Sequence, residues 1–153
     1  MDVCDAARWF VQHSDEKLSL WKLNDLCYYA YAWSCVLLEE PLFQDPGFLV
    51  EGGHFMCRKL FRFPETENVE PGNEEEKLLV SVLNCYGEFE EEELSRLICS
   101  EYPWEEAAGR AKREEQALIR ALRLYYSIKW LQHHSQEKIP GRILQTIKEE
   151  AFS

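Results

Sequence analysis

The stretch KLNDLCYYAYAW, from Lys22 to Trp33, decides the fold, because it places four large aromatic rings in a segment that otherwise has the pattern of a helix. Neither Gly nor Pro occurs between Ser19 and Pro41, and Ser is a residue type that often caps the start of a helix. We therefore predict one helix of about five turns that begins after Ser19 and ends before Pro41.

This helix is apolar around nearly all of its circumference, and Asp25 is the main polar residue outside its core stripe. A helix of this kind is normally surrounded by other elements of the protein. We therefore predict a buried central helix whose tyrosine hydroxyls are hydrogen-bonded or reach the surface, and the alternative is an exposed aromatic binding site. The predicted core stripe, at helical spacing, consists of Leu23, Leu26, Cys27, Ala30, Trp33 and Leu37.

Length and composition indicate one packed globular domain over residues 1–153, with 46% hydrophobic and 13% aromatic residues. A domain of this length buries roughly 70% of the surface of its unfolded chain, so it needs no metal or disulfide to fold. The six cysteines include no C-x-x-C pair, which favours reduced thiols. Because the chain has no apolar run of about 18 residues and begins with acids before its first Arg, we expect a cytoplasmic protein.

The rest of the chain also shows helical patterns, so we predict an all-α fold, a compact single-domain bundle of about six to seven helices around the central one. Residues 39–53 contain two prolines and three glycines and are predicted to form a loop with at most a short extended piece. Further helices are predicted over residues 3–13, 54–63 and 74–86, within 88–104, over 111–134, and in a C-terminal extension within 139–153.

Three local signals refine these helices. Asn73 followed by Glu76 has the spacing of a capping box at a helix start. Gly87 is predicted to end the helix that follows. In the last helix, the residues predicted to point inward are Ile143, Leu144 and Ile147.

The charged residues are segregated along the chain, whose formal net charge is −11. Residues 64–106 hold fourteen acids against only Lys77 and Arg96, whereas residues from 109 onward hold nine bases against five glutamates. Such blocks are most often solvated helix faces. An acidic surface disfavours binding to nucleic acid or anionic lipid and permits binding to a basic partner.

No pattern for catalysis or for cofactor binding occurs in the sequence, which has no G-x-S-x-G, phosphate-loop or H-E-x-x-H motif. His54 and Cys57 are the one pair with helical spacing for a metal, and a zinc ion needs at least three protein ligands. The basic helix near Tyr125, Tyr126 and Trp130 places its aromatics away from its arginines, which argues against a nucleic-acid stripe. We therefore expect neither enzyme activity, nor a metal or cofactor, nor direct nucleic-acid binding.

Two stretches, KLNDLCYYAYAW and CYGEFEEEELSRLICSEYPW, carry motifs in a recognisable order. The residues of these motifs are Lys22, Leu23, Leu26, Tyr28, Tyr29, Ala30 and Trp33, and then Tyr86, Gly87, Leu94, Ser95, Leu97, Glu101, Pro103 and Trp104. In order and spacing they resemble the Panacea domain, the SocA-like antitoxin family, over about residues 1–126. The sequence departs from the family pattern in three places: Asp25 replaces its second lysine, Tyr31 replaces its glutamine, and Gly53-His54-Phe55 stands where the family has Gly-Pro-Val.

The resemblance implies an all-helical, non-enzymatic protein of the kind found in phages and mobile elements. Members often neutralise a neighbouring toxin by direct binding, and one branch delivers the toxin to a protease. We therefore expect this chain to inhibit a protein partner, such as a toxin. By family position, the expected contact residues are His54, Phe55, Arg58, Lys59 and Trp104.

A competing hypothesis is a phage-encoded inhibitor of bacterial defence, of the anti-CRISPR type. Here the acidic middle of the chain would imitate nucleic-acid phosphates and occupy a basic groove of a defence protein, and the interaction would weaken steeply with salt. The acids expected to carry this surface are Glu74, Glu75, Glu76, Glu90, Glu91, Glu92 and Glu93.

Overall fold

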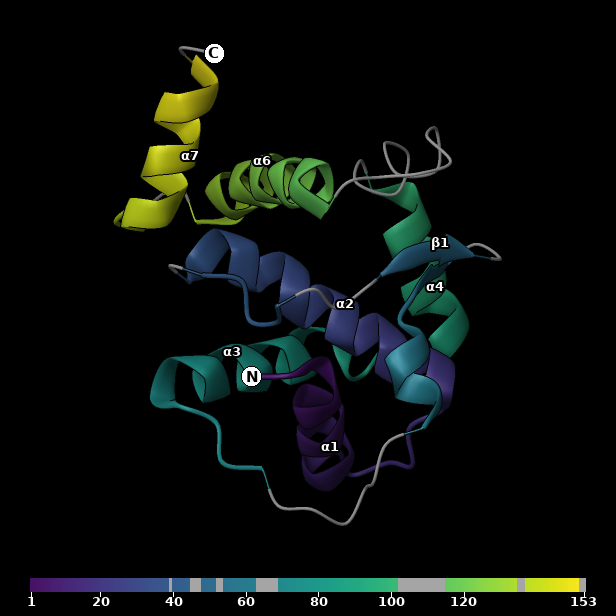
Figure 1. Cartoon of the computed structure of the whole chain (residues 1–153). Coiled ribbons are helices and arrows are strands. Elements are labelled where there is room, and N and C mark those ends of the chain that lie inside the picture. The colour runs from purple at the N-terminus through teal and green to yellow at the C-terminus, as the bar shows by residue number, and fades with distance from the viewer. Residues whose placement is uncertain are drawn as a thin grey trace.

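The computed structural model describes residues 1–38, 40–44, 48–51, 54–62, 69–101, 115–134 and 137–151. Six α-helices contain most of these described residues (Figure 1). The α-helices are α1 (Val3–His13), α2 (Leu20–Leu37), α3 (Asn73–Tyr86), α4 (Glu91–Ser100), α6 (Glu115–His133) and α7 (Gly141–Ala151). A short hairpin, β1 (Leu49–Glu51) with β2 (His54–Met56), and a 3₁₀ helix, η1 (Arg58–Phe61), complete the elements.

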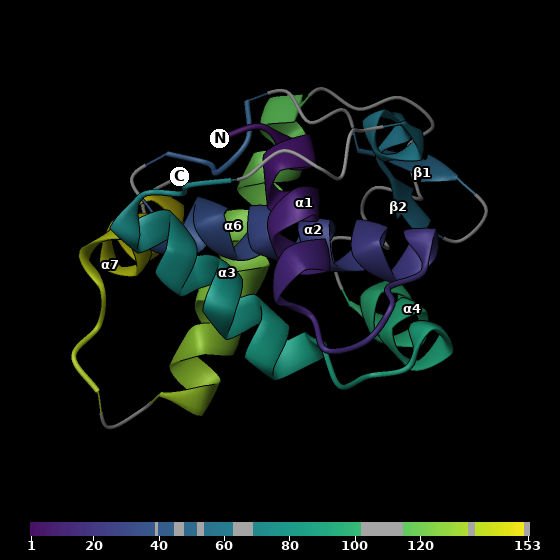
Figure 2. The same ribbon diagram turned by 90° about the horizontal axis from the view of Figure 1, so that it is seen from below.

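Helix α2 is the centre of the molecule, and it contacts α1, α3, α4, α6 and α7. Helices α1 and α3 cover one side of α2 and α6 covers the other (Figures 1 and 2). The rings of Tyr28, Tyr29 and Tyr31 are at most 1% exposed. The prediction of an all-α bundle around a buried helix is therefore confirmed, and the alternative of an exposed aromatic site at these tyrosines is wrong.

The helix starts follow local capping chemistry. The Ser19 side chain accepts a hydrogen bond from the Lys22 backbone N–H at 3.1 Å, as predicted for the start of α2. At α3 the prediction was wrong by one residue. Gly72, and not Asn73, is the N-cap, and its N–H donates to the side chain of Glu75. The sequence contains the three-residue spacing to a glutamate twice in succession, and the structure uses the first.

The helix predicted over residues 54–63 is wrong, because the described residues of this range form β2, which ends at Met56, and then η1, which ends at Phe61. Strand β2 pairs with β1 in antiparallel register, with Leu49 opposite Met56 and Glu51 opposite His54. The Cys57 backbone N–H that follows β2 donates to the Asn24 side chain at 2.9 Å instead of continuing a helix. The two residues between the strands in the sequence are both Gly, which is itself a hairpin signal.

Three residues predicted to face the core are less buried than expected. Leu37, at the end of α2, is 37% exposed, and Leu144 of α7 is 40% exposed. Trp33 is half-buried, and its indole Nε1 donates to the hydroxyl of Tyr86 at 3.0 Å. Leu37 is the last residue of α2. In α7 the described side chains that are buried are those of Ile143 and Thr146, so Leu144 lies beside the buried face. Ile143, in contrast, is fully buried.

Two further expectations concern the state of the cysteines and the presence of membrane-spanning helices. All six cysteines are free thiols, and Cys27, Cys35 and Cys57 are buried. In the part of the chain that the structure describes, none of the helices combines the length and the apolar character that a membrane span requires.

Candidate functional site

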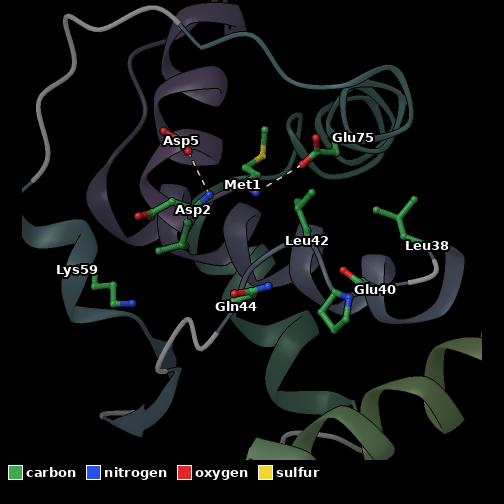
Figure 3. A pocket seen from close by; sticks show the side chains of 11 residues that line it. Met1, Asp2, Asp5, Leu38, Glu40, Leu42, Gln44, Lys59 and Glu75 are labelled. Carbon is green, nitrogen blue, oxygen red and sulfur yellow. Dashed lines mark hydrogen bonds and ion pairs between the residues drawn. The ribbon is translucent and has the colours of Figure 1, made fainter.

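A recess of about 660 Å³ lies beside the start of α1 (Figure 3). We call it the α1 recess. Leu38, Pro41 and Leu42 supply apolar wall, and Lys59 of η1 lies at its edge. The carboxylates that line it come from α1, from the segment after α2 and from the start of α3, and they are Asp2, Asp5, Glu40 and Glu75.

Three of these carboxylates, those of Asp2, Asp5 and Glu75, are held in place by hydrogen bonds at helix starts. Glu75 accepts from the Gly72 N–H at the start of α3. Asp2 accepts from the Cys4 backbone N–H at 2.7 Å and caps α1. Asp5 accepts from the Asp2 N–H at 3.1 Å and from Arg8 at 2.7 Å. Acidic side chains at helix starts are favoured by the helix dipole, so their presence here has a structural cause. A carboxylate oxygen has more than one lone pair, so these groups can accept further hydrogen bonds.

Helix η1 presents a mixed surface next to the α1 recess. Arg58 and Lys59 are exposed, and Phe61 is 50% exposed, although it is a large apolar residue. Leu60, between them, is buried at 2% exposure and anchors the turn. The Lys59 carbonyl also accepts a weak hydrogen bond from the Cys4 thiol, with Sγ and O 3.6 Å apart. Leu60 and the Lys59 carbonyl thus hold the turn against the rest of the protein, while the side chains of Arg58, Lys59 and Phe61 face solvent.

The structure brings four of the five expected contact residues onto one continuous segment. His54 and Phe55 belong to β2, and Arg58 and Lys59 belong to η1, which follows it directly. Trp104 lies outside the described residues. Sequence reasoning missed Phe61, and the signal was present as an aromatic residue beside two bases in RKLFRF.

The expected acidic surface is divided between two helix starts. Glu74, Glu75 and Glu76 occupy the first turn of α3, and Glu91, Glu92 and Glu93 occupy the first turn of α4. Glu90 is the N-cap of α4. Ten residues of α3, from Lys77 to Tyr86, follow the first group before the chain turns toward α4, which corresponds to about 15 Å along a helix. Glu75 and Glu91 are half-buried and the others are exposed.

A buried carboxylate joins three helices behind this surface. Glu101, directly after α4, is 2% exposed. Its Oε1 accepts from the hydroxyls of Tyr29 at 2.6 Å and Tyr126 at 3.0 Å, and its Oε2 accepts from Lys129 at 2.9 Å. Hydrogen bonds to an ionised group are stronger than neutral ones. We call these four residues the Glu101 cluster, and it ties α2, α6 and the end of α4 together.

The tyrosines of the Glu101 cluster act as hydrogen-bond donors. Burial, with the nearby Glu101 charge, raises the pKa of Tyr29 far above its ordinary value, and burial also raises the pKa of Tyr126. Both hydroxyls therefore keep their protons. The ring of Tyr29 stacks on that of Tyr86, with centroids 3.8 Å apart. No residue of the cluster lines the α1 recess, so we interpret the cluster as structural.

Comparison with known proteins gives no relative. No protein-family model matches the chain, and neither a curated protein nor a solved structure matches it. Among the described residues, no three His, Cys, Asp or Glu side chains are grouped so as to hold a metal ion.

Proposed function

We propose that the chain is a non-enzymatic inhibitor that neutralises a protein partner, such as a toxin, by direct contact through η1 and the neighbouring hairpin. The proposal follows the resemblance to the SocA-like antitoxins and the position of the expected contact residues. It names Arg58, Lys59 and Phe61 as the centre of the contact.

The observation that carries the proposal is the exposed Phe61 beside two basic side chains on an anchored turn. Aromatic residues and Arg are enriched in protein interfaces, and a few such residues often dominate the binding energy. Anchoring by Leu60 and by the Cys57 backbone lowers the entropy that the turn loses on binding. The α1 recess, with its carboxylates and apolar wall, adds a concave border with charge of the opposite sign.

Co-expression tests this proposal directly. The product of the gene that neighbours this one would be expressed alone and together with the chain in a bacterial host. We expect growth arrest with the neighbour alone, rescue by the chain, and a stable complex in affinity purification. A neighbour that is harmless alone, or that stays toxic in the presence of the chain, would falsify the antitoxin proposal.

Surface variants locate the contact in the same assay. Arg58→Glu with Lys59→Glu, or Phe61→Ser, should each weaken the complex by at least tenfold, because they reverse the charge or remove the apolar anchor. Lys138→Glu is the matched control, since Lys138 is also exposed and lies far along the chain, between α6 and α7. An equal loss in the control variant would place the contact elsewhere.

A second candidate function rests on the exposure of Glu74, Glu76, Glu92 and Glu93. In this proposal the two acidic helix starts occupy a basic nucleic-acid groove of a defence protein. Reversing the acids of the α3 start and of the α4 start in separate variants should each weaken inhibition, and added salt should do the same. Inhibition that survives both reversals would exclude nucleic-acid mimicry.

A further inference from the structure

Asp25 is a buried acid whose hydrogen bonds are incomplete. It lies on α2 and is 0% exposed. Its Oδ2 accepts from the Ser95 hydroxyl of α4 at 3.2 Å, whereas its Oδ1 has no hydrogen-bond partner among the described residues. Leaving a buried carboxylate oxygen unpaired is costly, so such groups call for an explanation beyond packing.

A recess of about 430 Å³ lies over Ser95 on the outer face of α4. We call it the Ser95 recess. Its lining is polar and comes from Glu91, Glu92, Ser95 and Arg96, which lie in the first two turns of α4. Because the Ser95 hydroxyl points inward to Asp25, the wall between the recess and the buried carboxylate is one side chain thick.

The charge around the Ser95 recess is unbalanced. Glu91 and Glu92 line it together with one cation, Arg96, and the carboxyl group of Asp25 lies behind Ser95. Arg96 lies 3.8 Å from Glu92, and both side chains are at least 80% exposed, so this pair is weak. A second cation in the recess would therefore meet two carboxylates, Glu91 and Glu92, against the single positive charge of Arg96.

Asp25 can respond to charge in the recess. Burial raises its pKa to about 7, and the negative charge of Glu91 adds to that effect, whereas hydrogen bonds from Ser95 and Asn24 lower it. The thiols of Cys27 on α2 and Cys99 on α4, whose pKa values the Asp25 charge also raises, stay protonated because burial raises the pKa of each. Near neutral pH the carboxyl group is thus divided between its two protonation states.

We propose that the Ser95 recess binds a basic side chain of a protein partner, and that Asp25, behind Ser95, is the carboxylate whose ionisation is coupled to that binding. The inference rests on the proposed function only for the identity of the partner. A cation in the recess favours the ionised form of Asp25, and ionised Asp25 in turn strengthens the binding of the cation. A bound cation that lowers this pKa by one unit would bind about fivefold more tightly at pH 8 than at pH 6.

A probe experiment tests the recess without the partner. N-acetyl-arginine amide, which has no group that titrates between pH 6 and pH 8, would be titrated into ¹⁵N-labelled protein at both pH values. We expect saturable amide shifts at Glu91, Ser95 and Arg96, and about fivefold tighter binding at the higher pH. Arg96→Gln should tighten binding, because it removes the competing cation.

The Asp25→Asn variant isolates the coupling. It keeps an acceptor for Ser95 and should bind the probe with an affinity that no longer changes between pH 6 and pH 8. Glu74→Gln, at the start of α3, is the matched control and should behave like the parent protein. The proposal fails if the shifts do not saturate, if sodium chloride at equal ionic strength reproduces them, or if Asp25→Asn keeps the pH dependence. A failed co-expression rescue would leave these results unchanged, so the two proposals fail separately.

Discussion

The Oδ1 atom of Asn24 accepts a hydrogen bond from the backbone N–H of Cys57 at 2.9 Å, which ties the central helix to the turn that carries the proposed contact residues. The next residue, Asp25, accepts a hydrogen bond from Ser95 of α4. Two neighbouring polar side chains of α2 thus fix two different parts of the surface. The proposed partner contacts depend on them, although neither side chain reaches solvent.

Asn24→Ala should destabilise the protein by about 1–3 kcal/mol, because the Cys57 N–H is left buried without this acceptor. Hydrogen exchange at Cys57 should become faster than at the amides of α3. Denaturation in urea measures the first effect and exchange mass spectrometry the second. Asn84→Ala, on the exposed side of α3, is the control and should stay within about 0.5 kcal/mol of the parent. Equal effects in both variants would contradict an anchoring role for Asn24.

Glu101→Gln should destabilise the protein by about 2–4 kcal/mol. The change leaves Lys129 without its carboxylate and weakens the bonds from the Tyr29 and Tyr126 hydroxyls, which are charge-assisted in the parent. Glu93→Gln, on the exposed face of α4, should have little effect. Urea midpoints of the two variants decide the matter, and a loss below about 0.5 kcal/mol for Glu101→Gln would show that the cluster adds little stability.

Stability should fall as the pH rises from about 4 to about 7. The folded-state pKa of Asp25 is about 7 against an ordinary value of 3.8, so in this window the folded chain holds a proton that the unfolded chain has lost. Asp25→Asn removes this effect. It should be more stable than the parent at pH 8 by up to about 4 kcal/mol, with a difference that shrinks toward pH 4.

Urea denaturation at several pH values gives the difference between parent and Asp25→Asn directly. Glu92→Gln is the control, because Glu92 is exposed and should leave the pH profile nearly unchanged. Parallel profiles for the parent and Asp25→Asn would show that Asp25 is ionised in the folded protein throughout this range.

Leu79→Ala and Val80→Ala compare adjacent positions on α3. Leu79 is 0% exposed and lies in the hydrophobic core, whereas Val80 is 40% exposed. Removing the Leu79 side chain should cost about 2–5 kcal/mol, because it loses buried area and leaves a cavity. The Val80 variant should cost less than about 1 kcal/mol. Similar losses at the two positions would mean that the outer face of α3 is also covered.

Elements whose signals are local could be predicted from the sequence. The start of α2 at Ser19 and the end of α3 at Gly87 follow from residue types within one turn. The two glycines between β1 and β2 in the sequence were a local signal for the hairpin. The end of β2 and the start of η1 could not be predicted in the same way, because the Cys57 N–H donates to Asn24, 33 positions earlier in the chain. A three-residue strand also gives too short a pattern to compete with a helical one.

The candidate site also combines features that the sequence predicts with features that depend on long-range packing. The family resemblance predicts Arg58 and Lys59 as contact residues, and both are exposed, as a contact role requires. Glu101 and Lys129 were not paired in advance, because 28 positions separate them and only the packing of α6 on α2 brings them together. Asp25 was recognised as polar, and its missing hydrogen bond became visible only with α4 in place.

Because most of α2 is buried, its side chains are more constrained in sequence than the side chains on the surface of the other elements. Substitutions on that helix disturb several neighbours at once, whereas the turn at Arg58 and the first turns of α3 and α4 touch water on their outer sides. A lineage carrying this fold could therefore acquire new binding preferences through a handful of outward positions, while the inner tyrosines keep the architecture constant.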